Sequence, residues 1–321
     1  MPKVSVLMPI YNTNLKYLKE AIESVLNQTY QDFEFLILND SPDNQELGDF
    51  VKSFADTRIK YFENRTNMGI TPSRNKLISL AESEYLMVMD HDDISLPTRI
   101  DKQVSYLDAH PDVGVIGCNV KNLIGDKITY YPVENEAIEE RLMCSCAISH
   151  SGCMIRKSVL LDNDIRYESV YSPAEDYSLF CRLIGKTKFY NIPEVLFLYR
   201  NHADNTTHRQ KEKMDHATFL IYDMVRKEHQ NIWEKVLEKG CVVSRIRILG
   251  LPVATLKKRG QEAKATVDKF HLANLYNKTK SVFKLFNLIP LITFYTKGKK
   301  IKGYLFNKIL VFESKNKFNL K

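Results

Sequence analysis

The feature that most constrains the fold is an alternation of short β-branched runs with helical patterns over the first half of the chain. Strands alternating with helices are typical of βαβ units around a mainly parallel sheet. The runs predict strands at residues 4–8, 33–38, 59–62, 85–89 and 113–118. Between them, apolar residues at helical spacing predict helices at residues 15–27 and 73–81. We therefore expect an α/β fold, with a mainly parallel sheet flanked by helices.

The alternation weakens after residue 120. A hairpin is expected around Gly125, and further elements are expected in the order helix (135–143), strand (around 152–155), helix (from near Pro173) and strand (195–199). From about residue 208 the pattern is helical and increasingly basic. A chain of 321 residues fits one large α/β domain with an appendage. We expect a first domain at residues 1–210 and a helical, basic C-terminal region at residues 211–321.

Charge separates the two ends of the chain. From Cys241 to Lys321 there are 18 Lys and Arg against 3 Asp and Glu, about +15 net, whereas residues 1–240 have 28 against 36, or −8. A basic tail suits anionic lipid headgroups or nucleic acid, while an acidic front half repels nucleic acid unless a metal ion intervenes. A solvated helix face explains the same charges without a partner.

Cysteine spacing and hydropathy bear on the compartment. The six cysteines form no CxxC pair and no disulfide framework, which indicates reduced thiols in the cytosol. The first residues, MPKVSVLMPIY, alternate like a strand and lack the blocks of a signal peptide. The longest apolar run, residues 285–295, contains Asn287 and Pro290 and is too short to span a bilayer. Any contact with a membrane is expected at its surface.

Three polar loops follow predicted strands, where an α/β sheet binds its ligands. They are residues 9–12, 39–43 and 90–93. The last has the sequence Asp90-His91-Asp92-Asp93, and its carboxylates repel one another unless a cation neutralises them. Mg²⁺ or Mn²⁺ suits such ligands and would bridge the phosphates of a donor. The alternative is a cluster of N-cap residues before a helix after Pro97.

Two acids at a predicted helix start, Glu175 and Asp176, form a second candidate site. Capping and the helix dipole favour acids there, so the pair alone is a weak signal. Beside a metal-bound donor, however, a sugar transfer needs one carboxylate to take the proton of the attacking hydroxyl. We assign this role to Asp176.

Other candidates are a cation and two histidines. Arg74 lies in the first turn of a helix after the Asn67 and Gly69 turn and is expected to reach a base or phosphate. His202 ends a strand in Tyr199-Arg200-Asn201-His202 and is a further metal or diphosphate ligand, or a lone surface histidine. His150 is a weaker candidate on the acceptor side.

In this order the motifs resemble those of family 2 glycosyltransferases. They are Pro9-Ile10-Tyr11-Asn12, Asn39-Asp40-Ser41, Asn67-Met68-Gly69 with Arg74-Asn75, Asp90-His91-Asp92-Asp93, Glu175-Asp176 and Tyr199-Arg200-Asn201-His202. The resemblance covers roughly residues 1–210. It implies a GT-A fold, which is a nucleotide-sugar-binding domain with a Rossmann-like mixed sheet flanked by helices, and an inverting mechanism.

The resemblance also implies roles for single residues. Asp40 would bind uracil, with Pro9, Tyr11, Asn12 and Asn67 around the base and Arg74 beside them. Asp90 would face ribose or metal next to His91, Asp92 would hold the metal, and Asp93 would lie toward the acceptor. The general base falls on Asp176, next to Glu175.

Two departures from the family pattern limit these expectations. The usual Asp-Asp-Gly-Ser loop is Asn39-Asp40-Ser41-Pro42 here, so a carboxylate and a glycine are lost. The Gln-x-x-Arg-Trp element and spanning helices of processive synthases are missing, which predicts addition of a single sugar. The remaining motifs are similar to those of bacterial enzymes that extend lipooligosaccharide, O-antigen or capsule repeats, some of which transfer N-acetylglucosamine or hexoses.

The basic tail contains a possible membrane anchor. Residues 281–295 mix apolar side chains with lysines, and residues 297–302 add a basic cluster, as in an amphipathic interfacial helix. We expect peripheral attachment to the inner face of the cell membrane, near a glycan or lipid-linked oligosaccharide acceptor. A helix packed on the catalytic domain is the alternative.

The sequence thus predicts a metal-dependent transferase that uses a UDP-sugar. Two other classes of protein fit parts of the sequence. A catalytically silent nucleotide-sugar-binding protein is suggested only by the altered Asn39-Asp40-Ser41-Pro42 loop. A nucleic-acid-binding protein would use the basic tail, but the chain lacks base-stacking platforms and any such motif. No nucleic acid partner is expected.

Overall fold

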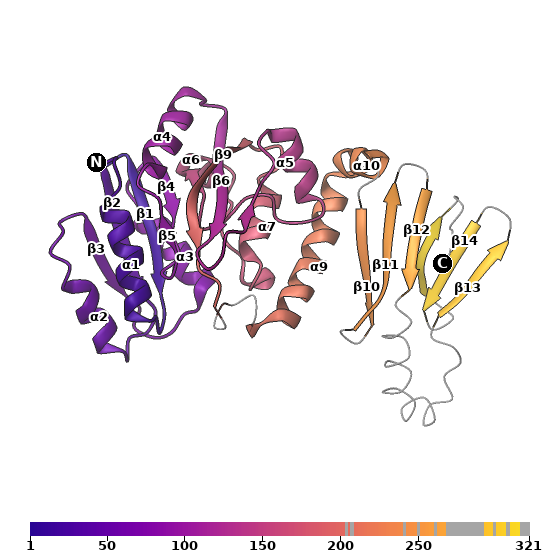
Figure 1. Ribbon diagram of the computed structural model, residues 1–321, viewed down its shortest axis with the longest axis horizontal. Coiled ribbons are helices and arrows are strands. Elements are labelled where there is room, and N and C mark those ends of the chain that lie inside the picture. Colours follow the sequence, from indigo (N-terminus) through magenta and orange to yellow (C-terminus); the bar gives the residue numbers. More distant parts are fainter. Residues whose placement is uncertain are drawn as a thin grey trace. The chain divides into compact units, whose positions relative to one another are not determined.

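Strand β1 (Val4–Ile10) lies inside the sheet of the first unit, and all seven of its residues are buried. It pairs in parallel with β2 (Phe33–Asn39) on one side and with β4 (Tyr85–Val88) on the other. Strands buried on both faces are continuous apolar runs, so their sequences alone predicted them. In the computed structural model the strand order is β3-β2-β1-β4-β8-β6-β9-β5, with β7 beside β6. Figure 1 shows β3, β2 and β1 at one end of this sheet.

The other strands make this nine-stranded sheet mixed. Strand β8 runs antiparallel to β4 and β6, whereas β6 and β9 are parallel to each other. The hairpin expected around Gly125 is formed by β6 and β7, and Gly125 has a φ of 92° in its turn. The bounds are β3 (Ile59–Glu63), β5 (Ile94–Ser95), β6 (Val113–Asn122), β7 (Ile128–Thr129), β8 (Met154–Arg156) and β9 (Lys188–Tyr199).

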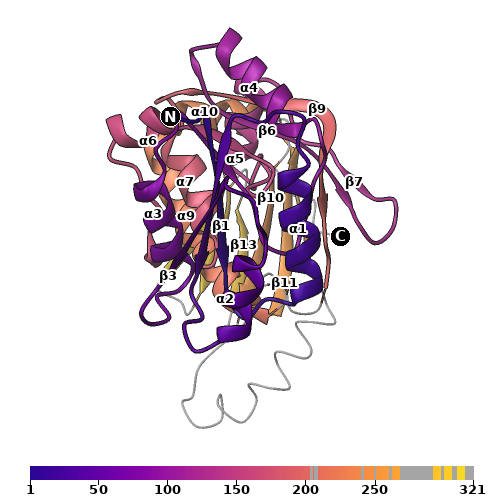
Figure 2. The same cartoon turned by 90° about the vertical axis from the view of Figure 1, so that its left-hand side faces the viewer.

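Helices cover both faces of the sheet. Helix α1 connects β1 to β2, and α3 connects β3 to β4, so the two connections run in opposite directions across the sheet. Because connections between parallel strands are right-handed, the two helices lie on opposite faces (Figure 2). The core packs α1 and α4 against the apolar residues of β1 and β2. The bounds are α1 (Leu15–Leu26), α2 (Gln45–Lys52), α3 (Ile70–Leu80), α4 (Arg99–Ala109), α5 (Asn135–Leu142), α6 (Lys157–Asp162), η1 (Ser169–Tyr171), α7 (Glu175–Arg182) and α9 (Lys211–Glu228).

The chain divides into two units, Met1–Glu228 and His229–Lys321. Helix α9 belongs to the first unit, where it contacts α7 and η1 and buries Ala217, Ile221 and Val225. The division therefore falls after Glu228 rather than after residue 210. All the candidate site residues lie in the first unit.

The second unit corrects the expectation of a helical C-terminal region. It begins with the helix α10 (Gln230–Lys239), but the described segments beyond it are strands. Runs such as VVSRIRI and ITFYTK are rich in β-branched and aromatic residues, which favour strands over helices. Two antiparallel sheets form, from β10 (Val242–Ile248), β11 (Leu251–Arg259) and β12 (Glu262–Val267), and from β13 (Ile292–Lys297), β14 (Lys300–Leu305) and β15 (Ile309–Ser314).

The structure describes residues 1–202, 205, 209–239, 242–248, 251–259, 262–267, 292–297, 300–305 and 309–314. Residues 281–291 of the expected interfacial helix lie outside these ranges, and its last residues fall in β13. Within the described ranges no helix is both long and apolar enough to cross a bilayer. The five described cysteines are free thiols.

Candidate active site

Asp40, directly after β2, organises the loop that leads into α3. Its Oδ1 accepts hydrogen bonds from Asn64 Nδ2 (2.7 Å) and from the backbone N–H of Met68 (2.8 Å), and its Oδ2 accepts one from the N–H of Gly69 (2.8 Å). Gly69 has a φ of 85°, a conformation that favours glycine. Three of the roughly four acceptor positions of the carboxylate are therefore occupied by the protein itself.

The loop after β1 lies against the Asp40 loop. Asn12 has a positive φ of 43°, and its backbone N–H donates to Ser41 Oγ at 2.8 Å. Tyr11 is more than half exposed, whereas Pro9 is buried within β1. Asn67 is exposed and its Nδ2 lies 3.4 Å from the carbonyl oxygen of Asp40. The residues expected around a base thus lie together at one edge of the sheet, where Pro9 is the buried member of the group.

Arg74 joins two acids that are far apart in the sequence. Its Nη1 lies 2.5 Å from Glu175 Oε1, its Nη2 lies 3.4 Å from Asp90 Oδ1, and its guanidinium lies over the ring of Tyr167. Burial opposes the charge of Arg74, but Asp90 and Glu175 outweigh that effect and raise its pKa. Arg74 was expected to reach a base or phosphate, and here both of its Nη atoms are used by protein carboxylates.

Asp90 follows β4 and lies between two partners. Besides Arg74, its carboxylate accepts a hydrogen bond from Ser151 Oγ through Oδ2. Burial opposes ionisation of Asp90, but the positive charge of Arg74 prevails and lowers its pKa. His91 is half-buried in the same turn. Asp90 is therefore ionised and held on both sides.

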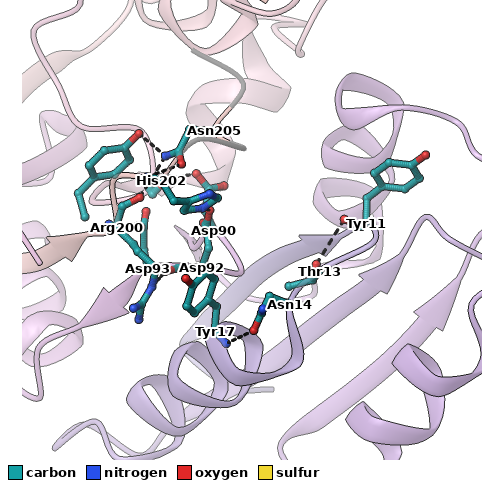
Figure 3. Close-up of polar contacts among 12 residues, drawn as sticks. Tyr11, Thr13, Asn14, Tyr17, Asp90, Asp92, Asp93, Arg200, His202 and Asn205 are labelled. Atoms are coloured by element: carbon teal, nitrogen blue, oxygen red, sulfur yellow. Dashed lines mark hydrogen bonds and ion pairs between the residues drawn. The ribbon is translucent and has the colours of Figure 1, made fainter. Parts of the chain in front are cut away.

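Asp92 and His202 lie side by side in a second part of the site (Figure 3). His202 Nε2 lies 2.8 Å from Asp92 Oδ2, and their side chains are 21% and 17% exposed. The ring of Tyr17, from α1, lies 5.6 Å from that of His202 between centroids. Two residues 110 positions apart in the sequence thus present an imidazole nitrogen and a carboxylate at one place.

Asp93 is turned into the protein and contacts the end of β9 (Figure 3). It is 1% exposed, and its Oδ1 accepts a hydrogen bond from the backbone N–H of Arg200 at 2.7 Å. Burial first, and then Asp92 and Asp90, raise its pKa well above the usual range. Arg200 Nε donates to the carbonyl oxygen of Asp92 at 2.7 Å, and its guanidinium lies 4.3 Å from the centre of the Tyr17 ring.

Asp176 lies in the first turn of α7, next to Glu175. Its Oδ1 accepts a hydrogen bond from the N–H of Tyr177 at 2.7 Å. Burial and the charge of Glu175 raise the pKa of Asp176 to about 6, although Arg74 acts in the opposite direction. A carboxylate with such a pKa is a stronger base than an ordinary aspartate and remains mostly ionised at neutral pH.

His150 is buried behind this group rather than exposed. Its Nε2 lies 2.7 Å from the hydroxyl of Tyr167, whose backbone is held by Asn75. Burial, with the nearby charge of Arg74, lowers the pKa of His150 to about 3, so the ring is neutral. Two residues that were assigned to the acceptor side, His150 and Asp93, are therefore buried and bonded to protein groups.

The sequence did not point to Ser151, Tyr167 or Tyr17. Each reaches the site through a contact between distant segments, and none belongs to a chemically distinctive motif. Ser151 adjoins the candidate residue His150, and Tyr17 lies within the helix predicted at residues 15–27. That proximity is a weak signal, because serine and tyrosine are common at such positions.

The candidate metal residues do not form a complete protein cage. Among the residues that the structure describes, no three His, Cys, Asp or Glu side chains are arranged to hold a metal ion. Asp92 and His202 offer one oxygen and one nitrogen donor. A divalent ion at this place would need further ligands from water or from a bound diphosphate.

Comparisons with known proteins identify the family of the chain. The profile described as glycosyl transferase family 2 matches residues 5–162. An uncharacterized glycosyltransferase of Methanocaldococcus jannaschii is 32% identical over 234 residues, which cover 68% of this chain and 78% of the relative. The O-antigen biosynthesis glycosyltransferase WbnJ of Escherichia coli is 28% identical over 233 residues, covering 70% of this chain and 89% of WbnJ.

Solved structures share the fold. TarS of S. aureus, residues 1–349, in complex with UDP-GlcNAc, has a TM-score of 0.57 and 20% identity, covering 74% of this chain and 80% of that one. The mannosyltransferase PcManGT of Pyrobaculum calidifontis, in complex with GDP-Man and Mn²⁺, has a TM-score of 0.55 and 14% identity, covering 74% and 70%. The predicted GT-A fold is confirmed. The chain is a glycosyltransferase and belongs to glycosyl transferase family 2.

Proposed function

We propose that this glycosyltransferase moves a single sugar, N-acetylglucosamine or a hexose, from a UDP-sugar to a hydroxyl group, with inversion at the anomeric carbon. The observation that carries the proposal is the position of Arg74, which pairs with Glu175 beside Asp176 and with Asp90 in the acidic loop. One cation, which is 13% exposed, thus connects the helix turn that carries the candidate base with the loop expected to hold the donor. Acceptor activation and donor binding would share one site.

Asp176 acts as the general base in this proposal. It takes the proton of the acceptor hydroxyl as that oxygen attacks the anomeric carbon, and the nucleoside diphosphate departs from the opposite face. The raised pKa of Asp176, about 6, supports this role. Glu175 keeps its Oε1 on Arg74 and holds that cation in place.

Asp92 and His202 are the residues proposed to hold a divalent ion. A carboxylate oxygen and an imidazole nitrogen suit Mn²⁺ better than Mg²⁺, because Mg²⁺ takes oxygen ligands almost exclusively. When bound, the ion would supply Lewis acidity toward the departing diphosphate. Tyr17 backs the ring of His202, and Arg200 fixes the carbonyl group of Asp92.

The hydrogen bonds of Asp40 support a uridine donor over a guanosine donor. Asp40 Oδ1 already accepts two hydrogen bonds and Oδ2 one, which leaves a single acceptor position. Uracil presents one imide N–H, whereas guanine presents two adjacent N–H donors that need both oxygens of a carboxylate. The exposed ring of Tyr11 is available to stack on the base.

A role in cell-surface polysaccharide biosynthesis is proposed from the relative WbnJ, which acts in O-antigen biosynthesis. The acceptor would then be a glycan or a lipid-linked oligosaccharide at the inner face of the membrane. The basic residues 241–321 support peripheral contact with anionic lipids in the cytoplasm.

Nucleotide release from a panel of sugar nucleotides tests the proposal. UDP-GlcNAc, UDP-glucose and UDP-galactose are assayed with Mn²⁺, with Mg²⁺ and with EDTA, with GDP-mannose as the contrasting base. We expect UDP release from at least one uridine donor, fastest with Mn²⁺ and abolished by EDTA. Equal rates with EDTA would contradict the metal assignment, and preference for GDP-mannose would contradict the assignment of Asp40.

A further inference from the structure

Arg99, on the first turn of α4, is a cation enclosed by the protein without a carboxylate partner. It is 0% exposed, and among the described residues no carboxylate forms an ion pair with it. Its Nη2 donates to the carbonyl oxygens of Val88 (2.9 Å) and Cys153 (3.0 Å), and its Nε donates to Gln103 Oε1 (3.2 Å). The guanidinium lies over the ring of Phe197.

Stability alone does not account for this residue. Burying a charged group is unfavourable, and burial lowers the pKa of Arg99. Apolar residues of similar volume often replace buried charges with no loss of stability. A methionine on α4 would fill the same space without that cost. The cation therefore points to a role other than filling the core.

The carbonyl groups that Arg99 holds flank the site on both sides. Val88 ends β4, two residues before Asp90, and Cys153 lies two residues after Ser151. Gln103, one turn further along α4, donates from Nε2 to the carbonyl oxygen of Gly152 at 2.9 Å. Arg99 and Gln103 thus hold the chain on each side of the hydrogen bond from Ser151 to Asp90.

The charge of Arg99 also lies close to the acidic loop. Asp90 and Asp93 are both near enough to act electrostatically on the guanidinium. Asp93 Oδ2 is buried and has no hydrogen-bond partner among the described residues. A fixed positive charge behind this loop offsets the repulsion among its carboxylates.

We propose that Arg99 and Gln103 are positioning residues: by holding Val88, Gly152 and Cys153 they set the contact between Ser151 and Asp90 and keep the acidic loop in its donor-binding geometry. The inference rests on the proposed function, because Asp90 is taken to face the donor. It adds two residues of α4 that touch neither donor nor acceptor.

The test compares UDP binding in the presence of Mn²⁺ by calorimetry for four proteins: wild type, Arg99→Met with Gln103→Leu, Arg99→Lys, and the control Arg156→Met. Arg156 also holds backbone carbonyls, of Leu107 and Val113, but it pairs with the opposite end of β4. Thermal unfolding is measured for each protein, and binding is expressed per folded molecule.

We expect UDP binding to be about tenfold weaker or more in the double variant, which is the usual effect of removing residues that orient the ligands of a site. The KM for the donor should change more than kcat. Arg99→Lys, which keeps the charge, should recover part of the loss, and Arg156→Met should bind like wild type. If the double variant does not fold, Gln103→Leu alone should weaken UDP binding in the same direction.

The inference would be overturned by unchanged UDP binding in the double variant, or in Gln103→Leu if the double variant does not fold. It would also be overturned if Arg156→Met weakened UDP binding as much as the double variant. The proposed function fails separately. In that case wild-type protein itself binds no UDP with Mn²⁺, whatever the variants do.

Discussion

The two halves of the site are built differently. Around Arg74 the charges are paired within the protein: Arg74 contacts Glu175, which is 3% exposed, and Asp90, which is 30% exposed. Among the residues that the structure describes, Asp92, which is 17% exposed, pairs instead with the imidazole of His202, a side chain that commonly binds metal ions. On the proposed function, the half with Asp176 is preorganised by protein ion pairs, whereas the half with Asp92 would be completed by a metal ion and the donor.

This difference has a physical reason. A general base must be held in one geometry before the acceptor arrives, and buried ion pairs fix side chains in that way. A site for a diphosphate and a divalent ion must instead leave ligand positions open, because the substrate supplies the remaining oxygens. Substitutions in one half should therefore change different quantities from substitutions in the other.

The largest effect is expected for Asp176→Asn. The amide cannot accept the proton of the acceptor, so kcat should fall by about 10² to 10⁴, while UDP binding with Mn²⁺ stays unchanged. Steady-state transfer assays with calorimetry measure both quantities. Asp162→Asn, an exposed carboxylate at the end of α6, is the matched control and should behave like wild type. Full activity of Asp176→Asn would remove this residue from the role of base.

The next effect concerns the stability of the preorganised half. Arg74→Met leaves the carboxylate of Glu175 buried and unpaired, so the free energy of unfolding should fall by about 3 to 5 kcal/mol. Arg166→Met breaks an exposed pair with Asp164 and should cost about 1 kcal/mol or less. Urea denaturation of both variants gives the comparison. Equal losses would show that burial does not distinguish these pairs.

In the half with Asp92, His202→Ala should act on metal binding rather than on the stability of the fold. We expect the Mn²⁺ concentration for half-maximal transfer to rise by about 10- to 100-fold, with little change in thermal stability. His216→Ala, an exposed histidine on α9, serves as the control. An unchanged Mn²⁺ requirement would exclude His202 as a ligand.

The smallest effect is the pH dependence. The pKa of Asp176 is raised to about 6, so its carboxyl group is protonated, and inactive as a base, below that pH. Between pH 7 and pH 5, kcat/KM should fall about tenfold. The same decline centred near pH 4 would indicate a base with an ordinary pKa.

The sequence predicted the local parts of this structure better than the long-range ones. β1, β2 and β4 were expected because their apolar runs are continuous, and the loops after them because polar residues follow directly. The pairing of Arg74 with Glu175 joins residues 101 positions apart, and no pattern near either one signals it. The enclosure of Arg99 likewise depends on Val88 and Cys153, which contribute only backbone carbonyls.

The C-terminal region was predicted less well for a related reason. Lysines among apolar residues suit either an amphipathic helix or a strand with one polar face, and short runs do not separate these two periods clearly. Helices were expected throughout, yet the described segments after α10 are strands. The β-branched and aromatic residues of these segments favour strands over helices.

UDP binding to wild type and to Asp92→Ala, each titrated with Mn²⁺ and with EDTA, tests whether Asp92 holds a metal ion that binds the donor diphosphate. If the half with Asp92 is completed by a metal and a diphosphate, wild type will bind UDP much more tightly with Mn²⁺, and Asp92→Ala will bind it weakly and equally in both conditions. The same UDP affinity for wild type with and without Mn²⁺, unaltered by the substitution, would contradict it.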